Sequence, residues 1–346
     1  MKNILKLTIF ILIPISACEK NNSSNSSANE KTVITKEKTG VTVAGGNGAG
    51  SAANQLSEPA DVFVDISGNI FVADAGNHRI QKWVPGATSG TTVAGGNGRG
   101  YGLNQLNNPQ GIFVDKNGTI YIADSGNHRI QKWTAGATSG IMVAGRMSPT
   151  GPLNGTNNDQ FSTPSAVFVD ASDNIYVADE GNSRIQKWVP GATTGSTVAG
   201  MAPTLNNPHP GDAANQLKWP KDVYVDSNGT IFISDYQNCR IQKWTQGSTT
   251  GVTIAGQNKP GNAADFLAGP TNLVFDSSGN MFIADFGNHR IQKWAPNASS
   301  GTTVAGGTVE GSSSNLLSNP QGVFVDQAGN IYIADKNNRR IQKWEK

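Results

Sequence analysis

The pentapeptide Arg79-Ile80-Gln81-Lys82-Trp83 occurs six times, without a change, in this chain of 346 residues. The later copies end at Trp133, Trp188, Trp244, Trp294 and Trp344, so the intervals are 50, 55, 56, 50 and 50 residues. A regular period of this length indicates a repeat architecture, in which each copy is one supersecondary unit and neighbouring units share a core.

Each unit contains four short β-rich segments separated by turn-forming residues. In the first unit they are residues 61–65, 69–74, 79–84 and 91–95, which we call strands a, b, c and d. Gly, Asn and Pro between the segments suit tight connections, and no segment has a helical period of useful length. Four antiparallel strands repeated six times predict an all-β, six-bladed β-propeller.

The ends of the chain predict how the ring closes. A d-type segment, Val41–Gly45, comes before the first a strand, and the chain stops just after the c strand of the sixth unit. We therefore expect this N-terminal segment to complete the last blade as its outer strand. Such closure removes the open edge that a ring cut between blades would have.

Composition limits the possible partners. The chain has 27 basic and 25 acidic residues. Without Lys2 and Lys6 of the leader the two signs balance at 25 each, which argues against nucleic acid as a partner. Cys18 and Cys239 are the two cysteines, so no disulfide framework supports the fold.

The N-terminus has the pattern of a secretory signal, because Lys2 and Lys6 flank a short apolar run that ends at Ile15. The run is too short to span a membrane. Its end, Ile15-Ser16-Ala17-Cys18, resembles the lipobox of bacterial lipoproteins, which implies cleavage before Cys18 and lipidation of that residue. The alternative is an ordinary signal peptide cut near Ala17.

These observations predict three parts: a signal peptide at 1–17, a lipidated Cys18 with a flexible tether through residue 39, and a propeller at 40–346. The predicted location is the bacterial cell envelope, either periplasmic or surface-exposed, with the membrane contacted through the lipid anchor only. We expect a monomer.

The repeated units resemble NHL repeats over about residues 40–346. Their shared pattern is P-x-G-[IV]-F-V-D-x-x-G-N-I-[YF]-[VI]-A-D-x-G-N-H-R-I-Q-K-W. The resemblance implies a six-bladed propeller. It implies no single function, since the family includes protein- and RNA-binding modules, ligand sensors outside bacterial kinases and metal-dependent amidating lyases.

Residues present in every unit are expected to serve the blade itself. The Asp-x-x-Asn-x-Arg sets, from Asp74, Asn77 and Arg79 to Asp335, Asn338 and Arg340, are expected to hold the b–c turn, and the RIQKW tryptophans to pack between blades. The aspartates that end the a strands are expected to cap their own turns, with a cation-binding ring as the alternative. They are Asp65, Asp115, Asp170, Asp226, Asp276 and Asp326.

His78, His128 and His289 share one repeat position, which holds Ser183, Cys239 and Arg339 in the other units. The family's lyases take a zinc ligand from a comparable hairpin, but these histidines are on blades one, two and five, too far apart to meet at one ion. Cys239 is interpreted as a half-buried thiol. We therefore predict no catalytic residue, metal or cofactor. The alternative is a hydrolase or lyase with Ca²⁺ or Zn²⁺ in the central channel.

A ligand site is expected where the blades differ. The d–a connection spans 14 residues in four units, but 19 from Gly145 to Pro164 and 20 from Gly200 to Pro220, and long loops often carry recognition. Trp219, beside the second, is the one tryptophan outside the repeat. The predicted ligand-binding set is Trp219, Lys218, Lys221, Asp222, Tyr236 and Phe286. Alternatively, Trp219 folds inward over its own loop.

These residues predict a binding module that recognises a protein, peptide or glycan on the face formed by the d–a and b–c loops. A structural spacer of the envelope is the third possibility. Asp61, Asp222 and Asn272 occupy the first channel position of their strands, and the sequence leaves open whether they converge.

Overall fold

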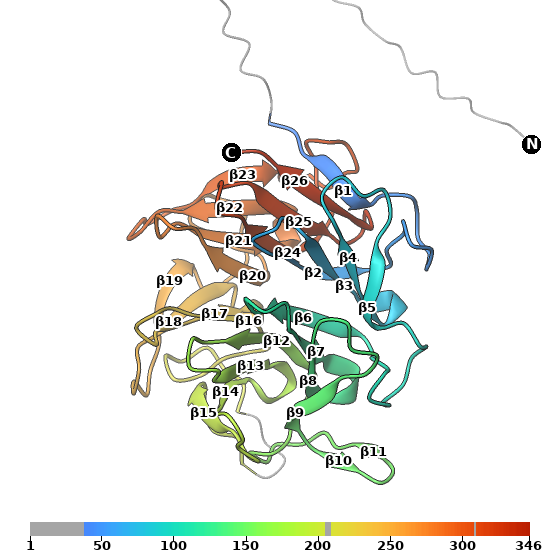
Figure 1. Ribbon diagram of the computed structural model, residues 1–346. Coiled ribbons are helices and arrows are strands. Elements are labelled where there is room, and N and C mark those ends of the chain that lie inside the picture. Colours follow the sequence, from blue (N-terminus) through green and yellow to red (C-terminus); the bar gives the residue numbers. More distant parts are fainter. Residues whose placement is uncertain (1–37, 205–208, 308) are drawn as a thin grey trace, which may run out of the picture. The chain divides into compact units, whose positions relative to one another are not determined.

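The computed structural model describes residues 38–204, 209–307 and 309–346, which belong to the compact unit Glu37–Lys346 (Figure 1). The predicted signal peptide, Cys18 and nearly all of the predicted tether lie outside the described residues, so the lipid anchor stays a prediction. Within the described ranges, no helix is both long and apolar enough to cross a membrane.

The unit is a propeller of six four-stranded antiparallel sheets, as the repeat predicts. Blade one contains β2 (Pro59–Val64), β3 (Ile70–Asp74), β4 (Arg79–Trp83) and β5 (Thr91–Gly95). Blade two contains β6 (Pro109–Val114), β7 (Ile120–Asp124), β8 (Arg129–Trp133) and β9 (Ile141–Gly145). Blade three contains β12 (Pro164–Val169), β13 (Ile175–Asp179), β14 (Arg184–Trp188) and β15 (Ser196–Ala199).

The second half follows the same order. Blade four contains β16 (Pro220–Val225), β17 (Ile231–Asp235), β18 (Arg240–Trp244) and β19 (Val252–Gly256). Blade five contains β20 (Pro270–Phe275), β21 (Met281–Asp285), β22 (Arg290–Trp294) and β23 (Thr302–Gly306). Blade six contains β24 (Pro320–Val325), β25 (Ile331–Asp335), β26 (Arg340–Trp344) and β1 (Val41–Gly45).

In blades one to five a single 3₁₀ turn joins strand b to strand c. These turns are η1 (Ala75–Asn77), η2 (Ser125–Asn127), η3 (Glu180–Asn182), η4 (Tyr236–Asn238) and η5 (Phe286–Asn288). The residue that follows each turn is left-handed, as at His78, where φ is 55°. The longer loop before blade three contains a small hairpin of β10 (Met147–Ser148) and β11 (Gly151–Pro152).

The ring closes in the way the sequence predicts. The innermost strands contact one another in the order β2, β6, β12, β16, β20 and β24, and β24 contacts β2. Strand β1 pairs antiparallel with β26, from Val41 opposite Lys343 to Gly45 opposite Arg340, and the two lie side by side in Figure 1. Ala44 of β1 is buried in a cluster shared by blades six and one. The first strand therefore joins the two ends of the ring.

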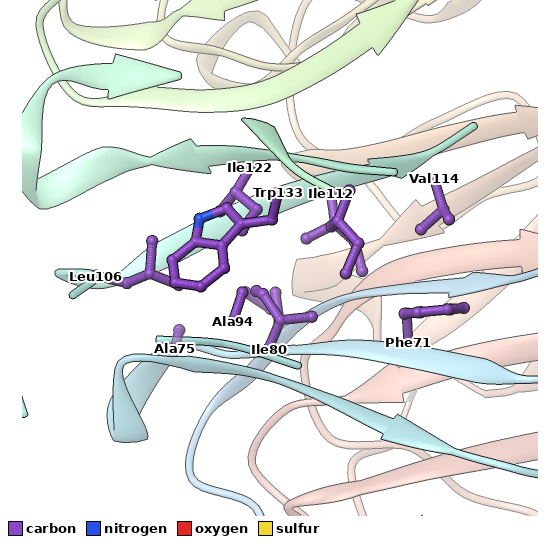
Figure 2. Packing of buried hydrophobic residues seen from close by; sticks show 12 residues of the cluster. Phe71, Ala75, Ile80, Ala94, Leu106, Ile112, Val114, Ile122 and Trp133 are labelled. Atoms are coloured by element: carbon purple, nitrogen blue, oxygen red, sulfur yellow. The ribbon is translucent and has the colours of Figure 1, made fainter. Parts of the chain in front are cut away.

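The hydrophobic core lies between blades. In Figure 2, Trp133 of blade two packs with Ile122 against Ile80 and Ala94 of blade one. The six RIQKW tryptophans are each at most 3% exposed, which confirms that they are packing residues. A Cβ on Gly90 would lie 2.8 Å from Cε2 of Trp83, so a glycine is needed where the chain approaches the indole.

The Asp-x-x-Asn-x-Arg sets tie each b–c turn to the loop before its blade. In blade one the buried Asp74 accepts hydrogen bonds from Nε of Arg79 at 2.7 Å, from Nδ2 of Asn77 at 2.8 Å and from the backbone N–H of Ser57 at 2.7 Å. Arg79 also donates to three loop carbonyl oxygens, those of Ser51, Ala52 and Gln55. The predicted structural role is confirmed.

The aspartates at the ends of the a strands cap their own turns. Oδ1 of Asp65 accepts hydrogen bonds from the N–H groups of Ser67 and Asn69, both at 2.9 Å, and Oδ2 accepts one from Nδ2 of Asn69 at 2.7 Å. Asp115 binds its turn in the same way through Asn117 and Thr119. The prediction of turn caps is confirmed, and these oxygens are occupied within their own turns.

Removing β1 tests how much the ring depends on its closing strand. A chain that starts at Gly46 should lose about 3–6 kcal/mol of unfolding free energy, because β1 contributes a buried Ala44 and ladder hydrogen bonds of about 0.5–1.5 kcal/mol each. Urea unfolding followed by tryptophan fluorescence measures the loss, with a chain that starts at Lys38 as the control. Equal midpoints for the two chains would show that β1 is dispensable.

Candidate functional site

The residue before the first proline of each a strand lies on the face of the d–a and b–c loops, and it is left-handed in all six blades. At Trp219 φ is 53°, and at the corresponding Gly269 it is 64°. This conformation suits glycine and asparagine, whereas other residues adopt it at a cost of roughly 1–2 kcal/mol. The backbone of the blade therefore does not favour a tryptophan at position 219.

The side chain of Trp219 is accessible. The residue is 45% exposed, and its indole forms no hydrogen bond or ring contact with another described residue. Burial over its own loop, the alternative interpretation of this residue, does not agree with that exposure. Residues 205–208 of the same loop lie outside the described residues.

Two other members of the predicted set contact each other beside the channel. Nζ of Lys221 lies 2.6 Å from Oε1 of Glu180 and 5.6 Å from the ring centroid of Tyr236. The Tyr236 ring packs on Gly269, where a Cβ would come within 2.7 Å of Cε2. Burial raises the pKa of the Tyr236 hydroxyl, and the charge of Glu180 adds to the effect.

A second acid–base pair lies near the first. Nζ of Lys336 is 3.8 Å from Oε2 of Glu58. Burial lowers the pKa of Lys336; Glu58 opposes this shift, and the charge of Lys221 adds to it. We call Glu58, Glu180, Lys221, Tyr236 and Lys336 the mouth cluster.

Sequence reasoning missed Glu58, Glu180 and Lys336. All three occupy positions at which the blades differ: Glu58 precedes the first proline, and Glu180 and Lys336 open their b–c turns. The criterion that points to Trp219 and Tyr236, a position at which the blades differ, applies to these three residues as well. Their pairing was not visible, because it joins different blades.

Lys218 and Phe286 lie on the same face but outside the mouth cluster. The backbone N–H of Lys218 donates to Asp235 at 2.7 Å. Phe286 opens η5, is partly exposed, and its carbonyl oxygen accepts a hydrogen bond from Nδ2 of Asn319 at 3.2 Å. Among the described residues, neither side chain forms a hydrogen bond or a ring contact with Trp219.

Asp222, a member of the predicted ligand-binding set, lies in the channel wall at the channel position that the sequence assigns to it, and not on the surface that carries Trp219. It is 7% exposed, because strand β16 turns this position toward the propeller axis. Its Oδ2 accepts hydrogen bonds from the N–H of Leu273 at 2.8 Å and from Nδ2 of Asn272 at 2.9 Å. Oδ1 of Asn272 accepts one from the N–H of Val323 at 2.9 Å.

Asp61 likewise accepts backbone hydrogen bonds at the junction of blades one and two. Its carboxylate accepts hydrogen bonds from the N–H groups of Val62 at 2.8 Å and Ile112 at 2.9 Å. Asp61, Asp222 and Asn272 all line one cavity of about 200 Å³, so the three channel residues do converge. Burial raises the pKa of Asp61 to about 8, and the Asp222 carboxylate adds to the shift. Burial raises the pKa of Asp222 to about 6.

The three repeated histidines connect neighbouring blades. Nδ1 of His78 accepts the N–H of Asn108 at 3.1 Å, and Nδ1 of His128 accepts the N–H of Thr163 at 3.0 Å. Nδ1 of His289 accepts the N–H of Asn319 at 3.2 Å. Cys239 occupies the same position in blade four. The imidazoles thus occupy three separate blade junctions, a geometry that does not fit one zinc ion.

Burial raises the pKa of the Cys239 thiol, with a smaller contribution from Asp285, so this position does not resemble an activated nucleophile. Within the described ranges, no group of three His, Cys, Asp or Glu side chains is placed to hold a metal ion.

Comparison with known families agrees with this architecture. Five segments match the NHL repeat family, at residues 56–83, 106–133, 161–188, 217–244 and 317–344. The chain is an NHL-repeat propeller. Blade five has the same strands but carries Leu273-Val274-Phe275 where blade one has Val62-Phe63-Val64, so its aromatic residue is shifted by one position.

Solved structures similar to this NHL propeller include binding proteins and enzymes. An auxiliary nutrient binding protein from Bacteroides ovatus has 14% identity and a TM-score of 0.62, over 89% of this chain and 76% of that one. A gluconolactonase from Xanthomonas campestris has 10% identity and a TM-score of 0.59, over 84% of this chain and 86% of that one. Virginiamycin B lyase from Staphylococcus aureus has 12% identity and a TM-score of 0.51, over 85% of this chain and 97% of that one. At these identities the likeness shows the fold alone.

A search of curated proteins found no significant match.

Replacing His78 and His128 by serine, which blade three carries as Ser183, should change how the stability of the NHL propeller depends on pH. Burial lowers the pKa of both imidazoles below 6.5, and Arg99 adds to the effect at His78. The fold therefore favours the neutral rings, so their contribution is present above pH 6.5 and is lost as the pH falls through the lowered values. Urea unfolding should show a larger gap between wild type and double variant at pH 8 than at pH 5. A gap that is constant or wider at pH 5 would contradict the assignment.

The substitution Asp61→Asn should stabilise the NHL propeller increasingly as the pH rises. A folded pKa of about 8, above the ordinary 3.8, means that the proton-bound form favours the fold, so this contribution is complete below pH 3.8 and lost as the pH rises through 8. Asparagine does not ionise, and Asn272 shows that the position accepts an amide. Unfolding midpoints at pH 5, 7 and 9 test the trend, and a pH-independent difference would refute it.

Proposed function

We propose that this NHL propeller is a lipid-anchored binding module of the bacterial cell envelope. It recognises a protein, peptide or glycan on the face formed by the d–a and b–c loops, with Trp219 as the main contact. The exposed, left-handed Trp219 is the observation that carries the proposal. The anchor at Cys18 rests on the sequence, as does the periplasmic or surface location.

Trp219 has the properties expected of a residue retained for binding. Its backbone conformation is unfavourable for tryptophan, its indole is 45% exposed, and no described residue hydrogen-bonds to it. Every blade has this left-handed conformation, so the fold does not explain why a tryptophan occurs here, and tryptophan is among the residues enriched at the centres of interfaces. Recognition therefore accounts for a side chain that the blade does not need.

The shape of the neighbouring channel mouth favours recognition without chemistry. Nε2 of Gln321 donates a hydrogen bond to Oε1 of Gln110 at 2.8 Å, which joins blades six and two across the axis. The hollow beside this bond is only about 20 Å³, too small for a substrate. A ligand of this face must therefore lie across the surface, as a protein, a peptide or a glycan chain does.

The mouth cluster supplies the polar part of such a surface. It presents Glu180 with Lys221, and Glu58 with Lys336, beside the ring of Tyr236. Charges of both signs around an aromatic ring suit a mixed polar ligand better than a polyanion. The nutrient binding proteins among the structural neighbours support the proposal at the level of the fold.

The test uses the full chain against a displayed peptide library and a glycan array. Ligands bound by the wild type should bind Trp219→Ala at least about tenfold more weakly, because central interface tryptophans carry a large share of the binding free energy. Tyr101→Ala is the matched control, since Tyr101 is 51% exposed on the same face but lies beside the β10–β11 hairpin. Equal binding by Trp219→Ala and wild type, or no ligand for the wild type in either collection, would count against this function.

A further inference from the structure

The channel contains a ring of aromatic side chains. Five of the six innermost strands place an aromatic residue at their fifth position, and blade five has Val274 there; the five are Phe63, Phe113, Phe168, Tyr224 and Phe324. Neighbouring ring centroids are 4.8–5.9 Å apart, so the rings contact one another around the axis. We call these five residues the aromatic collar.

Beyond the collar, toward the d–a face, the same cavity of about 200 Å³ is lined by Asp61, Asp222 and Asn272. Neither aspartate forms an ion pair with a described residue, although the buried Asp74 and its five equivalents are each paired with an arginine. None of the residues that line the cavity is cationic. The cavity therefore contains two carboxyl groups, five aromatic rings and no cationic side chain of its own. Lys221 lines the neighbouring hollow of about 20 Å³, which Asp61 and Asn272 also line.

The two ends of the channel differ. On the d–a side the bond between Gln110 and Gln321 lies over the axis. On the a–b side the collar residues are partly exposed, and Phe324 also lines an adjoining hollow of about 310 Å³ at the junction of blades six and one. The collar is therefore the part of the cavity wall that is partly exposed on the a–b side.

We propose that the channel binds a small organic cation with an alkylated ammonium group, which enters from the a–b side. Aromatic rings attract such cations, and the Asp222 carboxylate, which has no cationic partner in the same cavity, stabilises the charge. The cavity is smaller than the roughly 300–1,000 Å³ of sites for drug-sized ligands, so the ligand is compact. This site goes beyond the proposed function, because its carboxyl groups and aromatic rings lie within the channel, whereas Trp219 and the mouth cluster lie on the d–a face.

An inorganic divalent cation fits these residues less well. Ca²⁺ requires six to eight oxygen ligands, whereas the oxygen of Asn272 and both carboxylates already accept backbone hydrogen bonds. The collar offers rings in place of further oxygens. An alkylated ammonium group needs no such coordination, since its methyl groups carry the charge without N–H donors.

Calorimetric titration of the full chain with choline tests the inference. Choline should bind saturably, and 3,3-dimethyl-1-butanol, its neutral isostere, should bind at least about tenfold more weakly because it lacks the charge. Titration with calcium chloride tests the inorganic alternative. A folded protein that binds no choline, that binds both alcohols equally, or that binds calcium which choline does not displace would overturn the proposal.

Two variants locate the site. Asp222→Asn and Phe113→Leu should each weaken choline binding by about tenfold or more, the first by removing a charge and the second by removing a ring. Blade five has an amide, Asn272, at the position equivalent to Asp222, so the Asn variant should fold. Glu345→Gln is the control, because it removes an acid whose side chain is 82% exposed and which belongs to neither proposed site, so the affinity should be unchanged. Loss of affinity in Glu180→Gln but in neither channel variant would place choline in the mouth cluster and refute the channel site. Thermal unfolding with and without choline gives a second readout for any variant of reduced stability.

Discussion

The carboxylate of Asp124 and the guanidinium of Arg129 lie 2.8 Å apart with both side chains fully buried, and an equivalent pair occurs in every blade. Removing two charges from water is costly, so such a pair is stable only when its other hydrogen-bonding groups are satisfied. Asn127 and the carbonyl oxygens of the preceding loop satisfy them. The b–c turn and the d–a loop of each blade are therefore held as one rigid unit.

Loop rigidity explains how one face can carry recognition. The turns are held by the Asp, Asn and Arg residues that all blades share. Two positions on this face are therefore free to vary: the first residue of each turn and the residue before the first proline of each a strand. Glu180, Tyr236 and Lys336 occupy the first of these positions, and Glu58 and Trp219 the second. Side chains from separate blades are thereby presented at fixed spacings, so a ligand would meet a surface that needs little reordering.

The propeller axis separates two environments. The mouth cluster is polar and shallow, whereas the collar is aromatic and leads to two unpaired carboxyl groups. The hydrogen bond between Gln110 and Gln321 lies between them. A Cβ on Gly322 would lie 2.8 Å from Cα of Asp61, so the innermost strands of blades six and one approach too closely at this point for a larger residue.

The sequence by itself determined the strands, the six blades, the closing segment at Val41–Gly45 and the roles of the repeated Asp, Arg and Trp residues. These features depend on contacts within a blade or between adjacent blades, which every repeat must make and which therefore leave a periodic pattern. Only the tertiary structure decided that Asp61, Asp222 and Asn272 line one cavity, that His78 bonds to the next blade, that Glu180 pairs with Lys221, and that five aromatic residues form a collar. Such contacts join residues far apart in the chain or occur in only some blades, so their geometry follows from closing the ring and leaves no period to recognise.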